Sequence, residues 1–147
     1  RWSQWKQQDF TARLAPTPQV LEAFLQPLVD AGVDAFHCSQ RRFWEPEFDD
    51  SDMNLAGWVK KLTGMPTITV GSVSLDQDFV SQPSEGDGAT SEPASIDRLL
   101  EMLDRGDFDL VAVGRALIAN PDWPKVVRSG NTAGLQPYNK DLLAELA

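Results

Sequence analysis

Two short sequence pairs contain the residue types best suited to binding an anion. Gly71-Ser72 and Gly114-Arg115 each follow directly on a predicted apolar strand. Glycine lets backbone N–H groups approach a phosphate closely, and arginine adds a fork of charged donors. Residues 116–119, expected to form one helical turn, would direct a positive helix end at the same ligand. The two strand ends together predict a phosphate site, and an ordinary tight turn at each glycine is the alternative that the residues alone leave open.

These strand ends belong to a repeated order of helix, short strand and glycine-bearing loop. Thr17 is expected to cap a helix that starts at Pro18 and stops near Gly32, with Pro27 kinking its last turn. Its apolar stripe comprises Val20, Leu21, Phe24, Leu25 and Leu28. A short strand is predicted to follow at 34–37.

The second and third units follow the same order. A helix marked by Leu55, Trp58, Val59 and Leu62 ends at Gly64, and β-branched residues predict a strand at 67–70. Polar residues at 81–92 predict a surface insertion. Next comes a helix that Ser95 caps and Gly106 stops. Its predicted inward residues are Ile96, Leu99, Leu100 and Leu103.

The last predicted strand, 110–113, is apolar on both faces. Apolar strands separated by helices indicate a parallel sheet covered by helices. Periodicity leaves open whether that sheet closes into a barrel or stays an open doubly wound sheet.

Composition narrows the function classes. The 147 residues fit one domain with 41% apolar residues, and the net charge of −9 disfavours nucleic acid and anionic lipid as partners. No apolar run is long enough to span a membrane. One cysteine and one histidine exclude an internal disulfide and a His-rich zinc site. We therefore expect a cytoplasmic protein that binds neither membrane nor nucleic acid, and the initial Arg1 suggests a fragment.

Several residues near strand ends have competing interpretations. Aromatic side chains there either shape a substrate entrance or, as we favour, pack; they are Trp2, Trp5, Phe43 and Trp44. His37, next to Cys38, is expected to be a buried, hydrogen-bonded histidine rather than a catalytic one. A run of acidic residues fits no metal-binding loop and is expected to be solvated; it comprises Glu45, Glu47, Asp49, Asp50 and Asp52.

Three segments carry a family resemblance: RWSQWKQQD at 1–9, TITVGS at 67–72 and DLVAVGRALIANPD at 109–122. They resemble the C-terminal half of Old Yellow Enzyme family FMN oxidoreductases, whose characteristic pattern is Gly-Arg, a short apolar turn and Asn-Pro-Asp. The resemblance extends from Arg1 to about Leu143. It implies an α/β fold, the C-terminal half of a (β/α)8 TIM barrel with strands five to eight across 1–147, as a fragment of a longer flavoprotein domain.

The resemblance implies a cofactor-binding role for five residues. Arg1 matches the arginine beside the flavin pyrimidine edge, where its charge stabilises negative charge on N1 and the C2 carbonyl of reduced flavin. Gly71 and Ser72 match the phosphate loop after the seventh strand, and Gly114 and Arg115 match the loop after the eighth. The family's substrate-binding pair and proton-donating tyrosine belong to the earlier half of the barrel. We therefore assign no catalytic residue and no metal ligand here.

The implied activity is that of an FMN-dependent oxidoreductase. It takes hydride from NADH or NADPH and delivers it to an activated alkene, such as an enone. The expected partners are a small-molecule substrate and either a missing N-terminal half-barrel or a second copy through self-association; the fragment alone is expected to be inactive. The alternatives are a non-catalytic truncated half-barrel and a phosphate-binding TIM-barrel lyase or isomerase without flavin.

Overall fold

The computed structural model describes residues 1–6, 9, 11–77 and 90–145. These residues form two compact units. Unit 1 comprises Arg1–Gly71 and Asp97–Ala112, and unit 2 comprises Ser72–Ile96 and Val113–Ala147. Each unit is described by itself below.

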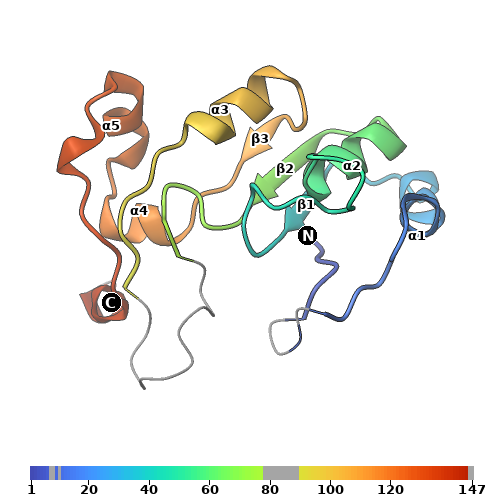
Figure 1. The fold of residues 1–147 in the computed structure, drawn as a ribbon, viewed down its shortest axis with the longest axis horizontal. Coiled ribbons are helices and arrows are strands. Elements are labelled where there is room, and N and C mark those ends of the chain that lie inside the picture. The colour runs from blue at the N-terminus through green and yellow to red at the C-terminus, as the bar shows by residue number, and fades with distance from the viewer. Residues whose placement is uncertain (7–8, 10, 78–89, 146–147) are drawn as a thin grey trace. The chain divides into compact units, whose positions relative to one another are not determined.

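Unit 1 contains a parallel sheet of three strands in the order β1-β2-β3 (Figure 1). β1 spans Phe36–Ser39, β2 spans Thr67–Val70 and β3 spans Leu110–Val111. Helices separate the strands along the chain. This confirms the α/β class and the parallel sheet predicted from the apolar strands, and the bounds of β2 match the prediction.

The N-terminal segment extends the sheet beyond β1. Trp2 forms a parallel bridge with Cys38. The backbone N–H of Trp2 donates to the carbonyl of His37 at 3.0 Å, and the N–H of Ser39 donates to the carbonyl of Trp2 at 2.9 Å. The chain therefore places a further parallel segment beside β1, as expected for a strand starting at Arg1.

The two faces of the sheet differ in burial. Strand residues alternate between faces, so Thr67 and Thr69 share one face, and both are fully buried. The register aligns His37, Ile68 and Leu110 on the other face, where Leu110 remains 58% exposed. This second face is therefore only partly covered within unit 1.

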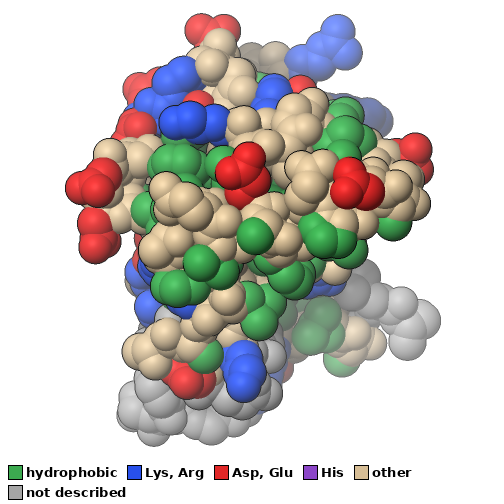
Figure 2. Space-filling view, turned by 90° about the vertical axis from the view of Figure 1, so that its right-hand side faces the viewer, with side chains coloured by type: hydrophobic (Ala, Val, Ile, Leu, Met, Phe, Trp, Pro, Cys, Tyr) green, Lys and Arg blue, Asp and Glu red, His purple; other side chains and the backbone are tan. Residues whose placement is uncertain are grey.

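α1, Pro18–Asp30, begins as predicted. The backbone N–H of Val20 donates to the Thr17 hydroxyl at 3.3 Å, and the helix continues through Pro27. The predicted apolar stripe is wrong in part. Leu21 and Leu25 are buried, but the other members remain exposed, at 44% for Val20, 41% for Phe24 and 37% for Leu28. Figure 2, which faces the side where α1 lies in Figure 1, shows hydrophobic side chains at the surface between polar ones.

α2, Leu55–Thr63, ends at Gly64 in the left-handed conformation, as predicted. Asn54 caps its N-terminus by accepting a hydrogen bond from the Gly57 N–H at 2.9 Å. α2 packs on β1 and β2. The Asn54 side chain also donates to the Thr69 hydroxyl at 3.2 Å, which ties the start of α2 to the buried face of the sheet.

Two predicted strands differ from the observed ones. The strand expected at 34–37 begins two residues later, because Asp34 and Ala35 are exposed whereas Phe36 is buried and its N–H donates to the Pro66 carbonyl at 2.9 Å. The strand expected at 110–113 is shorter and is not buried on both faces, because Leu110 lies on the partly covered face.

The third helix, α3, spans Asp97–Asp104. Its predicted inward face is also wrong in part. Leu99 is buried as expected, but the second buried position is Met102, whereas Leu100 is 49% and Leu103 is 37% exposed. Only some of the apolar residues of α3 therefore lie on the face of the helix that is buried.

The described residues of unit 2 form two short helices and two 3-10 segments. They are α4 at Arg115–Ala119, α5 at Trp123–Ser129, η1 at Thr132–Gly134 and η2 at Lys140–Glu145. α4 confirms the predicted helical turn. Most of the insertion predicted at 81–92 lies outside the described residues, namely 81–89. At its described end Glu92 is exposed, as expected of a surface segment, but Ser91 is fully buried.

Candidate functional site

Arg115, the first residue of α4, lies at the centre of a polar cluster in unit 2. Its Nη1 donates to the Ser91 hydroxyl at 2.9 Å, and its Nη2 donates to the Gln77 carbonyl at 2.7 Å. The same Nη2 lies 3.5 Å from the Ser72 hydroxyl. The structure thus brings together two predicted site residues, Ser72 and Arg115. We call these four residues together with Tyr138 the Arg115 cluster.

Tyr138 and Ser91 give the cluster a rigid backing. Each donates its backbone N–H to the other's carbonyl at 2.9 Å, and the Tyr138 side chain is 3% exposed. The Arg115 guanidinium carbon lies 5.6 Å from the centre of the Tyr138 ring, within cation–π range. The ring therefore helps to orient the guanidinium. Sequence reasoning missed Ser91, Gln77 and Tyr138 because these residues are brought together only by the tertiary fold.

The turn that carries Ser72 has an unusual backbone. Ser72 and Ser74 have φ values of 50° and 62°, in the left-handed region that serines rarely adopt. The Ala94 N–H donates to the Ser74 carbonyl at 3.0 Å, and the Ser74 hydroxyl reaches the Ala94 carbonyl at 3.4 Å. Strained residues of this kind often occur at ligand sites, where surrounding contacts stabilise them.

The two glycines predicted to bind the cofactor, Gly71 and Gly114, have different surroundings. At Gly71, with φ 152°, a Cβ atom would lie 2.6 Å from the carbonyl oxygen of Gln40, so backbone packing in unit 1 requires glycine. At Gly114 a Cβ atom would meet nothing within 4 Å. Packing therefore explains Gly71 and leaves the choice of glycine at Gly114 unexplained.

Arg1 lies in unit 1 beside the carboxyl end of β1. Its Nε donates to the Ser39 hydroxyl at 2.8 Å, and the residue is exposed. Burial, with the positive charge of Arg1 as the next cause, lowers the pKa of His37. The expectation of a hydrogen-bonded histidine is wrong for one ring nitrogen, because Nε2 of His37 is buried without a hydrogen-bond partner among the described residues.

The aromatic residues near the strand ends make packing contacts. Phe43 is 2% exposed and meets the ring of Trp44 edge-on, with the centroids 5.0 Å apart. Trp2 packs against Phe24 at 5.5 Å, and the Arg13 guanidinium covers the Trp5 ring at 4.5 Å. These contacts favour the packing interpretation over that of a substrate entrance.

Glu47 departs from the prediction of a solvated acidic loop. Its side chain is 2% exposed, and burial raises its pKa to about 7 despite the nearby Arg13. Gln4 donates to its carboxylate at 2.8 Å, and Arg13 donates to its backbone carbonyl at 2.8 Å. Residue spacing gave no signal for this contact, since Glu47 lies far from Gln4 and Arg13 in the chain.

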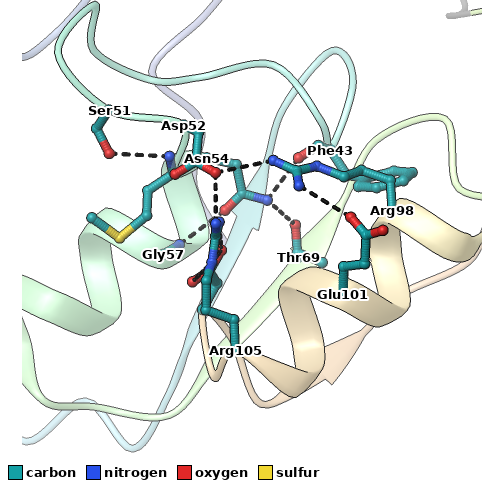
Figure 3. A network of polar contacts seen from close by, with 11 residues as sticks. Phe43, Ser51, Asp52, Asn54, Gly57, Thr69, Arg98, Glu101 and Arg105 are labelled. Atoms are coloured by element: carbon teal, nitrogen blue, oxygen red, sulfur yellow. Dashed lines mark hydrogen bonds and ion pairs between the residues drawn. The ribbon is translucent and has the colours of Figure 1, made fainter.

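Asp52, from the same acidic run, joins a surface network of ion pairs in unit 1 (Figure 3). Arg98 and Arg105 both reach its carboxylate, at 3.1 and 2.6 Å. Arg105 also binds Asp107 at 2.5 Å. These hydrogen bonds with the two arginines lower the pKa of Asp52. Because these groups are mostly exposed, the network fastens α3 to the loop before α2 with a small contribution from each pair.

Other reactive groups offer little chemistry. The thiol of Cys38 is buried, which raises its pKa to about 12 and keeps it a poor nucleophile. No group of three or more His, Cys, Asp or Glu side chains within residues 1–6, 9, 11–77 and 90–145 is arranged to hold a metal ion. Over the same residues, no helix combines the length and apolar character needed to cross a bilayer.

This chain is similar to an NADH oxidase. This chain and the oxidase, which is from Thermoanaerobacter brockii, are 30% identical over an alignment of 111 residues, and the alignment covers 70% of this chain. The match covers 14% of that oxidase, so the chain spans about a seventh of the length of its relative. No protein-family model matches the chain.

Proposed function

We propose that this chain forms the FMN-phosphate-binding half of a flavin-dependent NAD(P)H oxidoreductase of the Old Yellow Enzyme type. The observation that carries the proposal is the Arg115 cluster. A guanidinium and two serine hydroxyls converge at the start of α4, and two of these three residues, Ser72 and Arg115, match the family's phosphate loops. The similarity to an NADH oxidase supports the same reaction class.

The charge distribution supports an anion at this position. The chain has a net charge of −9, so an anion needs a local group of donors. The alternative role for Arg115 is an ion pair with Asp107 or Asp109, two carboxylates close to it in the sequence. In unit 1, Asp107 binds Arg105 and Asp109 binds Lys60 at 2.8 Å. Arg115 instead donates to oxygen atoms of its own cluster, and a phosphate would supply oxygen acceptors of the kind that a guanidinium binds well.

The residues of the chain would serve the flavin in two ways. FMN, when bound, supplies the transfer of hydride from NADH or NADPH to an activated alkene such as an enone. Arg115, Ser72 and the backbone at Gly114 would hold its phosphate. Gly71 would allow the backbone conformation of the turn that carries Ser72. Arg1 would stand at the pyrimidine edge, where a positive charge favours the anionic reduced ring.

The half-barrel is also part of the proposal. The parallel segments at Trp2, β1, β2 and β3 follow one another in chain order, as neighbouring barrel strands do. The partly covered face with Leu110, and the exposed stripe of α1, would then be covered by an N-terminal half-barrel or by a second copy. Size-exclusion chromatography with light scattering tests this, because a sharply monomeric, cooperatively melting isolated chain would contradict it.

The phosphate assignment is tested by comparing FMN with riboflavin, which lacks the phosphate. In the intact protein, Arg115→Ala should weaken FMN binding by about 1.5–3 kcal/mol, the worth of a hydrogen bond to a charged group. Riboflavin binding should be unchanged. Arg128→Ala is the matched control, because Arg128 is an exposed arginine of the same unit. Fluorescence quenching measures both ligands. Equal losses for both, or none for either, would contradict the assignment, and a purified protein without flavin absorption would contradict the flavin itself.

A further inference from the structure

Asn120, the residue directly after α4, is buried and uses both ends of its side-chain amide. It is 8% exposed. Its Oδ1 accepts from the Gln136 N–H at 2.8 Å, and its Nδ2 donates to the Gln136 carbonyl at 3.0 Å and to the Ala116 carbonyl at 3.2 Å. Two bonds to the backbone of one residue fix its distance and its orientation together. Asn120 therefore holds Gln136 against the end of α4.

The residues after Gln136 have little freedom to move away from this position. Pro137 restricts the backbone rotation between Gln136 and Tyr138. Tyr138 is then held from the other side, because it and Ser91 exchange backbone hydrogen bonds of 2.9 Å. Its ring is 3% exposed, and the ring centre lies 5.6 Å from the guanidinium carbon of Arg115. This stretch thus links one end of α4 with the side chain at the other end.

The buried amide of Asn120 favours one arrangement of this stretch over others. Burying an amide without hydrogen-bond partners is costly. Two of the three bonds of the Asn120 side chain go to Gln136. Any shift of Gln136 away from α4 would leave buried polar atoms of Asn120 unsatisfied. The residue therefore stabilises the position of the stretch in which Tyr138 meets Arg115.

We propose that Asn120 is a positioning residue for Arg115. By holding Gln136 at the end of α4, it places the Tyr138 ring against the guanidinium at the start of the same helix. The other contacts of Arg115 within its cluster add to this orientation. The spacing between Arg115 and Asn120, which is the length of α4, is what lets one residue act on the other in this way. This inference rests on the proposed function only for the flavin as the ligand of Arg115.

The orientation of Arg115 can be observed by NMR of the intact protein without any ligand. The resonance of the Arg115 Nε–H group is sensitive to an aromatic ring nearby. Tyr138→Leu removes the ring and gives the position of this resonance without it, whereas Tyr138→Phe keeps the ring and should leave the resonance close to that of the wild type. Asn120→Ala should move the resonance towards its position in Tyr138→Leu. An unmoved resonance in folded Asn120→Ala would overturn the inference, whatever the protein binds.

Asn131→Ala is the matched control, because Asn131 is an exposed asparagine of unit 2 whose side chain makes no capping hydrogen bond. It should leave the Arg115 resonance unchanged. Thermal melting checks that each variant folds. Asn120→Asp keeps the acceptor for the Gln136 N–H and loses the two donated bonds, so it should shift the resonance in the same direction as Asn120→Ala. If Asn120→Ala does not fold, Asn120→Asp takes its place in the comparison.

Flavin binding tests whether Asn120 acts through Tyr138. Asn120→Ala and Tyr138→Leu should each lower the FMN affinity about fivefold, the equivalent of one cation–π contact, and leave the riboflavin affinity unchanged. The double variant should lose no more than either single variant, since both changes remove the same contact. Losses that add up in the double variant, or equal losses for FMN and riboflavin, would overturn the inference. Wild-type protein that binds no flavin would contradict the proposed function, and the NMR comparison would still decide the role of Asn120.

Discussion

Gln4 donates a hydrogen bond of 2.8 Å to the carboxylate of Glu47, and both side chains are 2% exposed. The same amide group of Gln4 exchanges hydrogen bonds with the backbone of Ala15, at 3.0 and 2.7 Å. Gln4 thus joins the backbone at Ala15 to the buried carboxylate of Glu47 in the loop after β1, and the protonation of that carboxylate matters for stability.

Glu47→Gln should change how stability depends on pH. Burial raises the pKa of Glu47 from an ordinary 4.5 to about 7, so between these values the folded chain holds a proton that the unfolded chain has lost. Stability therefore falls as pH rises through this window. Glutamine removes that loss and should stabilise the protein at pH 8 by roughly 2–3 kcal/mol relative to the wild type. Urea unfolding at pH 4.5 and pH 8 measures the difference.

The matched control is Glu22→Gln, at an exposed glutamate of α1. It should retain the pH dependence of the wild type. If Glu47→Gln and Glu22→Gln followed the same stability curve, Glu47 would be ionised in the folded protein at neutral pH.

Asn54→Ala should destabilise the protein far more than loss of an ordinary helix cap. Asn54 is fully buried and caps α2, and its amide also donates to the Phe43 carbonyl at 2.8 Å and to the Thr69 hydroxyl. The loss should be about 2–4 kcal/mol, since two acceptors are left unsatisfied in the core. Thr17→Ala, which removes the exposed cap of α1, should cost about 1 kcal/mol. Chemical denaturation compares them, and equal losses would mean that the buried bonds contribute nothing.

The parts of the fold that the sequence predicts well are those that depend on neighbouring residues, such as the ends of helices. Thr17 with Pro18 starts α1, and Gly64 ends α2, because caps depend on neighbouring residues. Burial of a helix face depends on what lies opposite. That is why Met102, and not Leu100 or Leu103, is buried on α3.

The candidate site shows the same division. Gly71, Ser72, Gly114 and Arg115 stand out because short motifs lie directly after strands. Gln77, Ser91 and Tyr138 are separated from them in the chain, and the backbone pairing that buries Ser91 leaves no pattern in the residue order. Tertiary packing decides which segments far apart in the chain come close together. A single sequence shows no periodic pattern from which these contacts can be predicted.

Gly71→Ala and Gly114→Ala should have opposite consequences. At Gly71 the new Cβ would lie 2.6 Å from the Gln40 carbonyl oxygen with φ at 152°, so we expect a loss of at least about 2 kcal/mol of stability. At Gly114 the Cβ meets open space, so stability should change by less than about 1 kcal/mol. FMN affinity should nevertheless fall in Gly114→Ala, because the Cβ hinders backbone approach to phosphate. Thermal melting and FMN titration separate the two effects, and full FMN affinity in Gly114→Ala would remove Gly114 from the site.

Arg1→Ala should make bound flavin harder to reduce. The loss of positive charge near the pyrimidine edge removes stabilisation of the anionic reduced ring, so the reduction potential should become more negative. Ser39→Ala, which removes the hydroxyl that Arg1 Nε contacts, keeps the charge and should shift the potential less. Redox titration of the intact flavoprotein measures both. An unchanged potential with unchanged flavin affinity would place Arg1 outside the site.

The interleaving of the two units has a consequence for the order in which the protein is made. β1, α2 and β2 leave the ribosome in the order in which they lie side by side, so they can pair during synthesis. Their neighbour β3 emerges only after the stretch 72–96, which belongs to the other unit. Until Asp109 arrives to bind Lys60 and the Thr67 N–H, the nascent sheet presents the edge of β2 to other chains. Translation speed across 72–96 therefore sets how long that edge is exposed, and pausing there should lower the yield of folded protein.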